Sequence, residues 1–166
     1  MNTPIRTALA LALIGASALA QAQSGAVLSE RNVSLALANQ IAAATVAACS
    51  ASGYAVTATV VDRAGNVRAM QRADNAGPHT LEASRLKAYT SASARNTTLA
   101  MMEASQKNPA AANLKDIPGY LLLGGGVPVR AGNDVIGAVG VGGAPGGHLD
   151  EQCAMAALEQ VKAALQ

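Results

Sequence analysis

Residues 55–72, AVTATVVDRAGNVRAMQR, are the stretch from which the fold is best predicted. The run Ala55–Val61 is rich in β-branched residues, and Val67–Arg72 is a second short extended run. Between them, Asp62–Asn66 carries Asp, Gly and Asn, residues that favour tight turns. The segment is therefore predicted to form a β-hairpin.

Helices are predicted on both sides of this hairpin. Before it, Ser29 can cap a helix that ends near Ser52, because apolar residues recur at spacings of three and four. After it, one helix is predicted over His79–Ala94 and a shorter one over Thr97–Gln106, which Pro109 would end.

The second half of the chain returns to short apolar runs separated by glycine. We expect strands at Tyr120–Leu123, Val127–Arg130 and Val135–Val141, and a closing helix over Leu149–Leu165. Hairpin connections imply a mainly antiparallel sheet of about five strands flanked by helices, which is an α+β fold. Because no repeat or linker interrupts residues 23–166, a single domain is predicted.

The N-terminus has the pattern of a secretory signal peptide over residues 1–22. Arg6 supplies the positive end, Thr7–Leu19 is apolar, and small residues at Ala18, Ala20 and Ala22 suit cleavage. The apolar run is shorter than the roughly 20 residues that a membrane span needs. The mature chain is therefore expected to be periplasmic or secreted, with no membrane span after cleavage.

Composition argues against two classes of partner. The chain has 12 basic and 10 acidic residues, so no excess of charge favours nucleic acid or a membrane surface. Three tyrosines, with no Trp or Phe, cannot build a base-stacking platform. The apolar residues are mostly small, and each buries little area, so we expect extra burial in a homo-oligomer.

The two cysteines, Cys49 and Cys153, leave two interpretations open. Export would permit a disulfide between them. They could equally be two small buried apolar residues on neighbouring helices, since the sequence does not give the distance between their Cα atoms.

The densest group of reactive side chains is in residues 75–90, NAGPHTLEASRLKAYT. His79 stands at a proline-marked helix start, and Glu82, Arg85 and Lys87 follow within about two turns. An imidazole with nearby cations suits haem, because imidazole binds iron and cations bind propionates. Two other interpretations stay open: His79 as a surface or capping group, and Arg85 paired with Glu82 along the helix.

Other motifs carry less weight. The glycines of Gly137–Gly147 do not match a dinucleotide-binding fingerprint or a P-loop, and they favour close backbone packing. Ser84 and Lys87 match SxxK, but the companion motifs of penicillin-recognising enzymes are missing from the sequence. His148 lies in a glycine-rich stretch and is expected to be a surface residue. No spacing of His and Cys indicates a dedicated zinc site.

Seven short motifs occur in order along the chain. They are VVDRAGN at 60–66, MQRADNAGP at 70–78, RLKAYT at 85–90, LGGGVPV at 123–129, IGAVGV at 136–141, GAPGG at 143–147 and DEQCA at 150–154. In these motifs the chain resembles the GlcG/HbpS-like family, also found as the C-terminal domain of PduO-type proteins. The resemblance implies a profilin-like sandwich, homo-oligomers and, in some members, haem or corrinoid-related ligands.

The resemblance also suggests residues. Thr97 falls near a threonine that binds haem in one branch of the family, and His79 stands where that branch has glutamine. Together with the local pattern, this gives a hypothetical ligand-binding set of His79, Thr80, Glu82, Arg85, Lys87 and Thr97.

The leading hypothesis is an exported, homo-oligomeric haem-binding protein with His79 as the iron ligand. The alternative is an enzyme or accessory protein acting on a small organic acid or a tetrapyrrole. There His79 would be the general acid or base, and Arg85 would bind the carboxylate. A third hypothesis is an assembly role without a ligand.

Overall fold

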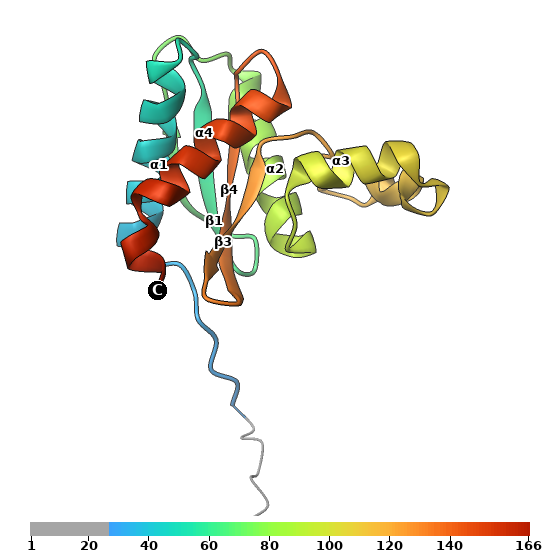
Figure 1. The fold of residues 1–166 in the computed structure, drawn as a ribbon, viewed down its shortest axis with the longest axis horizontal. Coiled ribbons are helices and arrows are strands. Elements are labelled where there is room, and N and C mark those ends of the chain that lie inside the picture. Colours follow the sequence, from blue (N-terminus) through green and yellow to red (C-terminus); the bar gives the residue numbers. More distant parts are fainter. Residues whose placement is uncertain (1–26) are drawn as a thin grey trace, which may run out of the picture.

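The computed structural model describes residues 27–166, and the predicted signal peptide lies outside the described residues. A four-stranded antiparallel sheet forms the middle layer of the molecule (Figure 1). Among residues 27–166, no helix is long and apolar enough to cross a membrane.

The sheet consists of β1 (Thr57–Asp62), β2 (Val67–Arg72), β3 (Gly126–Ala131) and β4 (Asp134–Gly142), in the order β2-β1-β4-β3. The predicted β1–β2 hairpin is confirmed. Its turn is held by the Asp62 carboxylate, which accepts from the backbone N–H groups of Ala64 and Asn66 at 3.0 and 2.9 Å.

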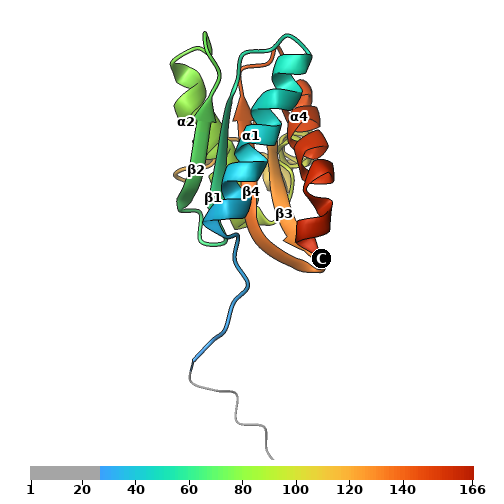
Figure 2. The same ribbon diagram turned by 90° about the vertical axis from the view of Figure 1, so that its left-hand side faces the viewer.

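Helices cover both faces of the sheet. α1 (Leu35–Ala51) and α4 (Gly147–Gln160) lie on one face, and α2 (His79–Ala94) lies on the other (Figures 1 and 2). α3 (Thr98–Lys107) and the 3₁₀ helix η1 (Pro109–Asp116) project away from the sheet (Figure 1). A last 3₁₀ turn, η2 (Lys162–Leu165), ends the chain.

The expectation of about five strands is corrected to four, because Tyr120–Leu123 is not a strand. The backbone of this segment binds side-chain hydroxyls instead of a neighbouring strand. Leu121 donates its N–H to the Thr90 hydroxyl at 2.8 Å, and the Leu123 carbonyl accepts from Thr98 at 2.8 Å.

Two helix boundaries also differ from the expectation. Ser34, and not Ser29, caps α1, because its hydroxyl accepts from the backbone N–H of Leu37 at 3.2 Å. The predicted closing helix is divided, since α4 ends at Gln160 and η2 follows.

Glycine lets α2 approach the sheet closely. A Cβ atom at Gly140 of β4 would lie 2.1 Å from the Ser84 carbonyl oxygen, so only glycine fits there. The contact between α2 and β1 is polar as well as close. The hydroxyls of Thr57 and Thr80 are 2.7 Å apart, as are those of Thr59 and Ser84.

A disulfide joins Cys49 of α1 to Cys153 of α4, with the Cα atoms 5.3 Å apart. Of the two interpretations of the cysteines, the bridge is therefore the one that the structure contains. It links elements 104 residues apart in sequence and holds together the two helices on this face of the sheet.

Candidate functional site

A hollow of about 220 Å³ lies where the N-terminal half of α2 meets the glycine loop, residues 142–147. From α2 it is lined by His79, Ala83 and Lys87, which share one face of the helix because they are four residues apart. Leu123, which precedes β3, and Asp150, at the start of α4, complete the lining.

The inner wall of the hollow is a buried ion pair. Lys87 Nζ lies 2.8 Å from Asp150 Oδ2 and donates to the Val141 carbonyl at 2.8 Å. Only 2% and 3% of the two side chains are exposed. Asp150 Oδ1 accepts from the backbone N–H of Ala144 at 3.0 Å, so the pair also fixes the glycine loop.

The electrostatics of Asp150 reflect two opposing effects. Burial raises the pKa of the Asp150 carboxyl, and the charge of Lys87 and its hydrogen bond partly offset the rise. The pair also needs space, because a Cβ atom at Gly125 would lie 2.7 Å from Asp150 Cβ and 3.1 Å from Lys87 Nζ.

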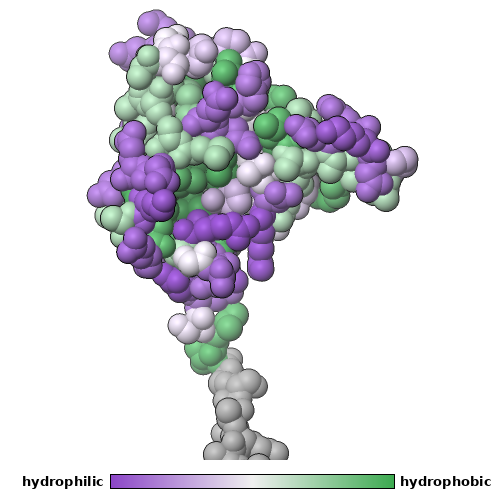
Figure 3. All heavy atoms as spheres, viewed as in Figure 1, coloured by the Kyte–Doolittle hydropathy of each residue, from purple (hydrophilic) through white to green (hydrophobic). Residues whose placement is uncertain are grey.

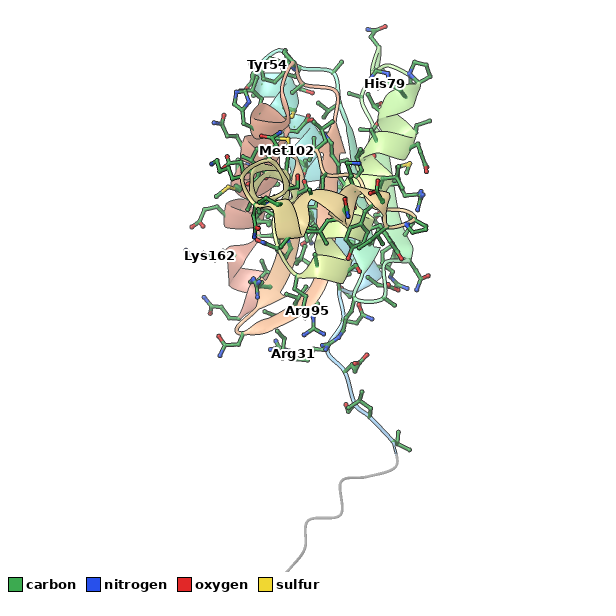
Figure 4. All side chains as sticks on the ribbon, turned by 90° about the vertical axis from the view of Figure 1, so that its right-hand side faces the viewer. Arg31, Tyr54, His79, Arg95, Met102 and Lys162 are labelled. Carbon is green, nitrogen blue, oxygen red and sulfur yellow. A yellow bond between two sulfur atoms is a disulfide. The ribbon has the colours of Figure 1, made fainter. Side chains whose placement is uncertain are left out.

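His79 occupies the mouth of the hollow at the first position of α2, and its side chain is exposed (Figure 4). The imidazole folds back over Gly77, where a Cβ atom would lie 2.7 Å from the ring. Because Gly77 has no side chain, the imidazole can lie directly against the backbone at this position. An exposed imidazole beside a hollow is available to a ligand, a metal centre or a proton-transfer partner.

The other predicted residues have separate tasks. The Thr80 hydroxyl is buried and donates to the Gly77 carbonyl at 2.6 Å, which holds the start of α2. Thr97 caps α3 by accepting from the backbone N–H of Ala100 at 3.3 Å. Neither residue lines the hollow.

Glu82 and Arg85 form a pair on the outer surface of α2. Two nitrogens of Arg85 lie 2.8 and 2.7 Å from the two carboxylate oxygens of Glu82. This hydrogen-bonded pair lowers the pKa of Glu82 and raises that of Arg85. Of the six predicted residues, the structure thus brings only His79 and Lys87 to the hollow.

Sequence reasoning missed the roles of two acidic residues, Asp150 and Glu151. Glu151 is 9% exposed, and its Oε2 atom has no hydrogen-bond partner among the described residues. Burial raises the pKa of its carboxyl, while the Leu99 and Gly125 backbone N–H groups and the Thr97 hydroxyl lower it in part. The available signal was a pair of acids at the start of the helix that follows the glycine-rich stretch.

Among residues 27–166, no three His, Cys, Asp or Glu side chains are grouped so that they could hold a metal ion.

Comparison with known proteins identifies relatives along most of the chain. The family model described as "Haem degrading protein HbpS-like" matches residues 33–159. An uncharacterized 15.0 kDa protein of Citrobacter freundii, from the dhaT-dhaS intergenic region, is 35% identical over 113 residues. The alignment covers 67% of this chain and 80% of that protein.

Two solved structures have the same architecture. A double mutant of HbpS from Streptomyces reticuli is 34% identical with a TM-score of 0.77, covering 95% of this chain and 99% of that one. A PduOC–haem complex is 22% identical with a TM-score of 0.71, covering 77% of this chain and 94% of that one. The resemblance seen in the sequence motifs is confirmed. This chain belongs to the HbpS-like family.

Proposed function

We propose that the protein binds haem at the hollow, with the His79 imidazole as the iron ligand. The observation that carries this proposal is the exposed imidazole at the mouth of a hollow whose inner wall is a fixed ion pair. Imidazole is a common axial ligand of haem iron in proteins. The haem-related name of the family supports the choice of ligand.

The residues of the hollow fit haem in part. The donor is suitable, but a volume of about 220 Å³ is below the roughly 300–1,000 Å³ of typical ligand sites. The hollow alone would therefore leave much of a tetrapyrrole outside. A second protomer could supply the missing wall, and homo-oligomerisation is part of the proposal for this reason.

Each residue near the ligand would have a defined task. Lys87 is held by Asp150 and Val141, so it would shape the inner wall and not bind a propionate directly. The N-terminus of α4, which has no side-chain cap, would favour a carboxylate. Arg85 could bind a propionate only by releasing Glu82. The bound haem would supply the iron and any redox chemistry.

Export is the other part of the proposal. It rests on the signal-peptide pattern in residues 1–22 and on the Cys49–Cys153 bridge, because disulfides persist in oxidising compartments. Expression of the full chain in a Gram-negative host, followed by fractionation and N-terminal sequencing, tests it. The expected result is a periplasmic protein cleaved near residue 22; a full-length cytoplasmic protein would contradict it.

Titration with hemin, followed by the Soret band, tests the ligand. We expect a shifted Soret band for the unchanged protein and at least tenfold weaker binding for His79→Ala, about 1.4 kcal/mol. His148→Ala is the matched control, because the other histidine is exposed and does not line the hollow. Equal hemin affinity of the two variants would refute the role of His79.

A small organic acid is the second candidate, favoured by the size of the hollow. Here the start of α4 would hold the carboxylate, and His79 would act as general acid or base. Turnover of such an acid with a pH–rate limb in the histidine range, lost in His79→Ala, would support this candidate over haem. Binding of hemin without any turnover would count against it.

A further inference from the structure

Among residues 27–166, one buried side-chain atom has no hydrogen-bond partner, and it is Oε2 of Glu151. Only 9% of this residue is exposed. The backbone N–H groups of Leu99 and Gly125 and the Thr97 hydroxyl act on its carboxyl, but none of them satisfies Oε2. A buried polar atom without a partner is costly, so a fold that retains one needs a reason for it.

Glu151 lies where three elements meet. It belongs to α4, Leu99 lies in the first turn of α3, and Gly125 directly precedes β3. Thr98 joins two of these elements, because its hydroxyl donates to the Leu123 carbonyl and accepts from the Gly126 N–H, both at 2.8 Å. We call residues 97–99 the arm root, since the chain leaves the body of the molecule there.

The arm itself, which we define as residues 98–117, contains α3 and η1. It stands away from the body, with hydrophilic residues over much of its surface (Figures 1 and 3). In α3 only Thr98 and Met101 are buried, and η1, which packs chiefly against α3, contains no buried residue. The arm is therefore attached mainly through its root. A segment with so few buried groups opens more readily than the core does.

The charges around Glu151 oppose its ionised form in a closed root. Burial disfavours the negative charge, and Glu103 of α3 repels it. Asp150, the neighbouring acid of α4, is already paired with Lys87 of α2, and residues 124–126 are all glycine and carry no charge. No cation is among the groups that act on the Glu151 carboxyl. Exposure to water is therefore the available way to stabilise the ionised form.

We propose that Glu151 is a pH-operated latch between α4 and the arm root. With a neutral carboxyl the root stays closed, and with an ionised carboxyl the root opens so that water reaches the charge.

The direction of the effect follows from linkage. In the closed root the pKa of Glu151 is raised above its ordinary value of 4.5, whereas a hydrated carboxyl in the open root keeps that value. The closed root therefore binds the proton more tightly. Opening is rarest below pH 4.5, increases as the pH rises towards the raised pKa, and becomes constant above it.

The latch is connected to the hollow beside His79 through the segment before β3. Leu123 lines the hollow, and its carbonyl is held by Thr98. A Cβ atom at Gly125 would lie 2.7 Å from Asp150 Cβ, so this segment packs tightly against the buried ion pair. Opening of the root therefore loosens one wall of the hollow. The latch does not depend on haem binding, because neither Glu151 nor the root lines the hollow.

Hydrogen exchange of the haem-free protein, followed by mass spectrometry, tests the latch. Exchange is measured at pH 5, 6 and 7, and each rate is corrected for the intrinsic effect of pH on amide exchange. We expect opening of peptides that cover residues 97–107 and 123–126 to be about threefold or more greater at pH 7 than at pH 5. Peptides from α1 serve as the internal control and should show no such change.

Three variants separate the latch from a merely structural role. Glu151→Gln is neutral at every pH, so the root should stay closed and its exchange should no longer depend on pH. Glu159→Gln, an exposed position on the same helix, should keep the full dependence. Glu103→Gln removes the repulsion and should move the transition to lower pH, a readout that remains if Glu151→Gln misfolds. Exchange at the root that is independent of pH in the unchanged protein, greater opening at pH 5, an unmoved transition in Glu103→Gln, or a dependence that persists in Glu151→Gln would overturn the inference.

Discussion

At the scale of single residues, the site depends on the contrast between His79 and Lys87. Both lie on one face of α2, but the imidazole is exposed while only 2% of the lysine side chain is. From the sequence alone, Lys87 is predicted to bind an anionic group of the ligand through its positive charge. The partner that changes this role, Asp150, is 63 residues away in sequence, so local spacing cannot reveal it.

Removal of Lys87 should be costly, because it leaves the buried Asp150 carboxylate without its cation. We expect Lys87→Ala to lower the free energy of unfolding by about 3–5 kcal/mol, measured by urea denaturation. The control Lys115→Ala breaks an exposed pair and should cost less than about 1 kcal/mol. If the two variants lost equal stability, Lys87 and Asp150 would not be the buried pair described here.

Glu151 should make stability depend on pH. Burial raises the pKa of its carboxyl in the folded state above 4.5, the ordinary value. The folded state therefore binds this proton more tightly, and stability rises as the pH falls from neutral through the raised pKa towards 4.5. Burial also raises the pKa of Asp150, which contributes a rise of the same sign, so Glu151→Gln should reduce the rise seen by urea denaturation between pH 7 and 5 and not abolish it. Glu159→Gln, at an exposed position, should retain the full rise, and an unchanged profile for Glu151→Gln would contradict the assignment.

At the scale of elements, the sequence predicts the hairpin, the helices and the antiparallel sheet correctly, because their signals are local. The wrong strand at Tyr120–Leu123 shows the limit. Its apolar pattern resembles a strand, but the hydroxyls of Thr90 and Thr98 take its backbone groups, and these residues are distant in sequence. The disulfide likewise depends on a distance between two helices that no local pattern contains.

The approach of α2 to β4 gives a test at this scale. Gly140→Ala would place a methyl group 2.1 Å from the Ser84 carbonyl oxygen, and we expect a loss of about 1–3 kcal/mol or more. Gly142→Ala on the same strand meets its neighbours at 3.4 Å or more and should cost less than about 1 kcal/mol. Equal urea midpoints for the two variants would show that α2 does not approach β4 at Gly140 as closely as described here.

At the scale of the whole molecule, the layer formed by α1 and α4 is held together by a disulfide. α1 and α4 share a face of the sheet, and the Cys49–Cys153 bridge joins them. Replacement of both cysteines by Ala should lower stability by about 2–5 kcal/mol, measured by thermal unfolding of the oxidised protein beside the variant. Free thiols in the purified protein, or an unchanged melting temperature, would contradict this structural role.

The central claim is that the hollow beside His79 is a haem site. The most direct measurement is a crystal structure of the protein with hemin, with the iron located by anomalous scattering. We predict one iron peak per protomer within bonding distance of a His79 ring nitrogen, at the mouth of the hollow. Iron bound at any other residue, or crystals that take up no hemin from a saturating solution, would contradict the claim.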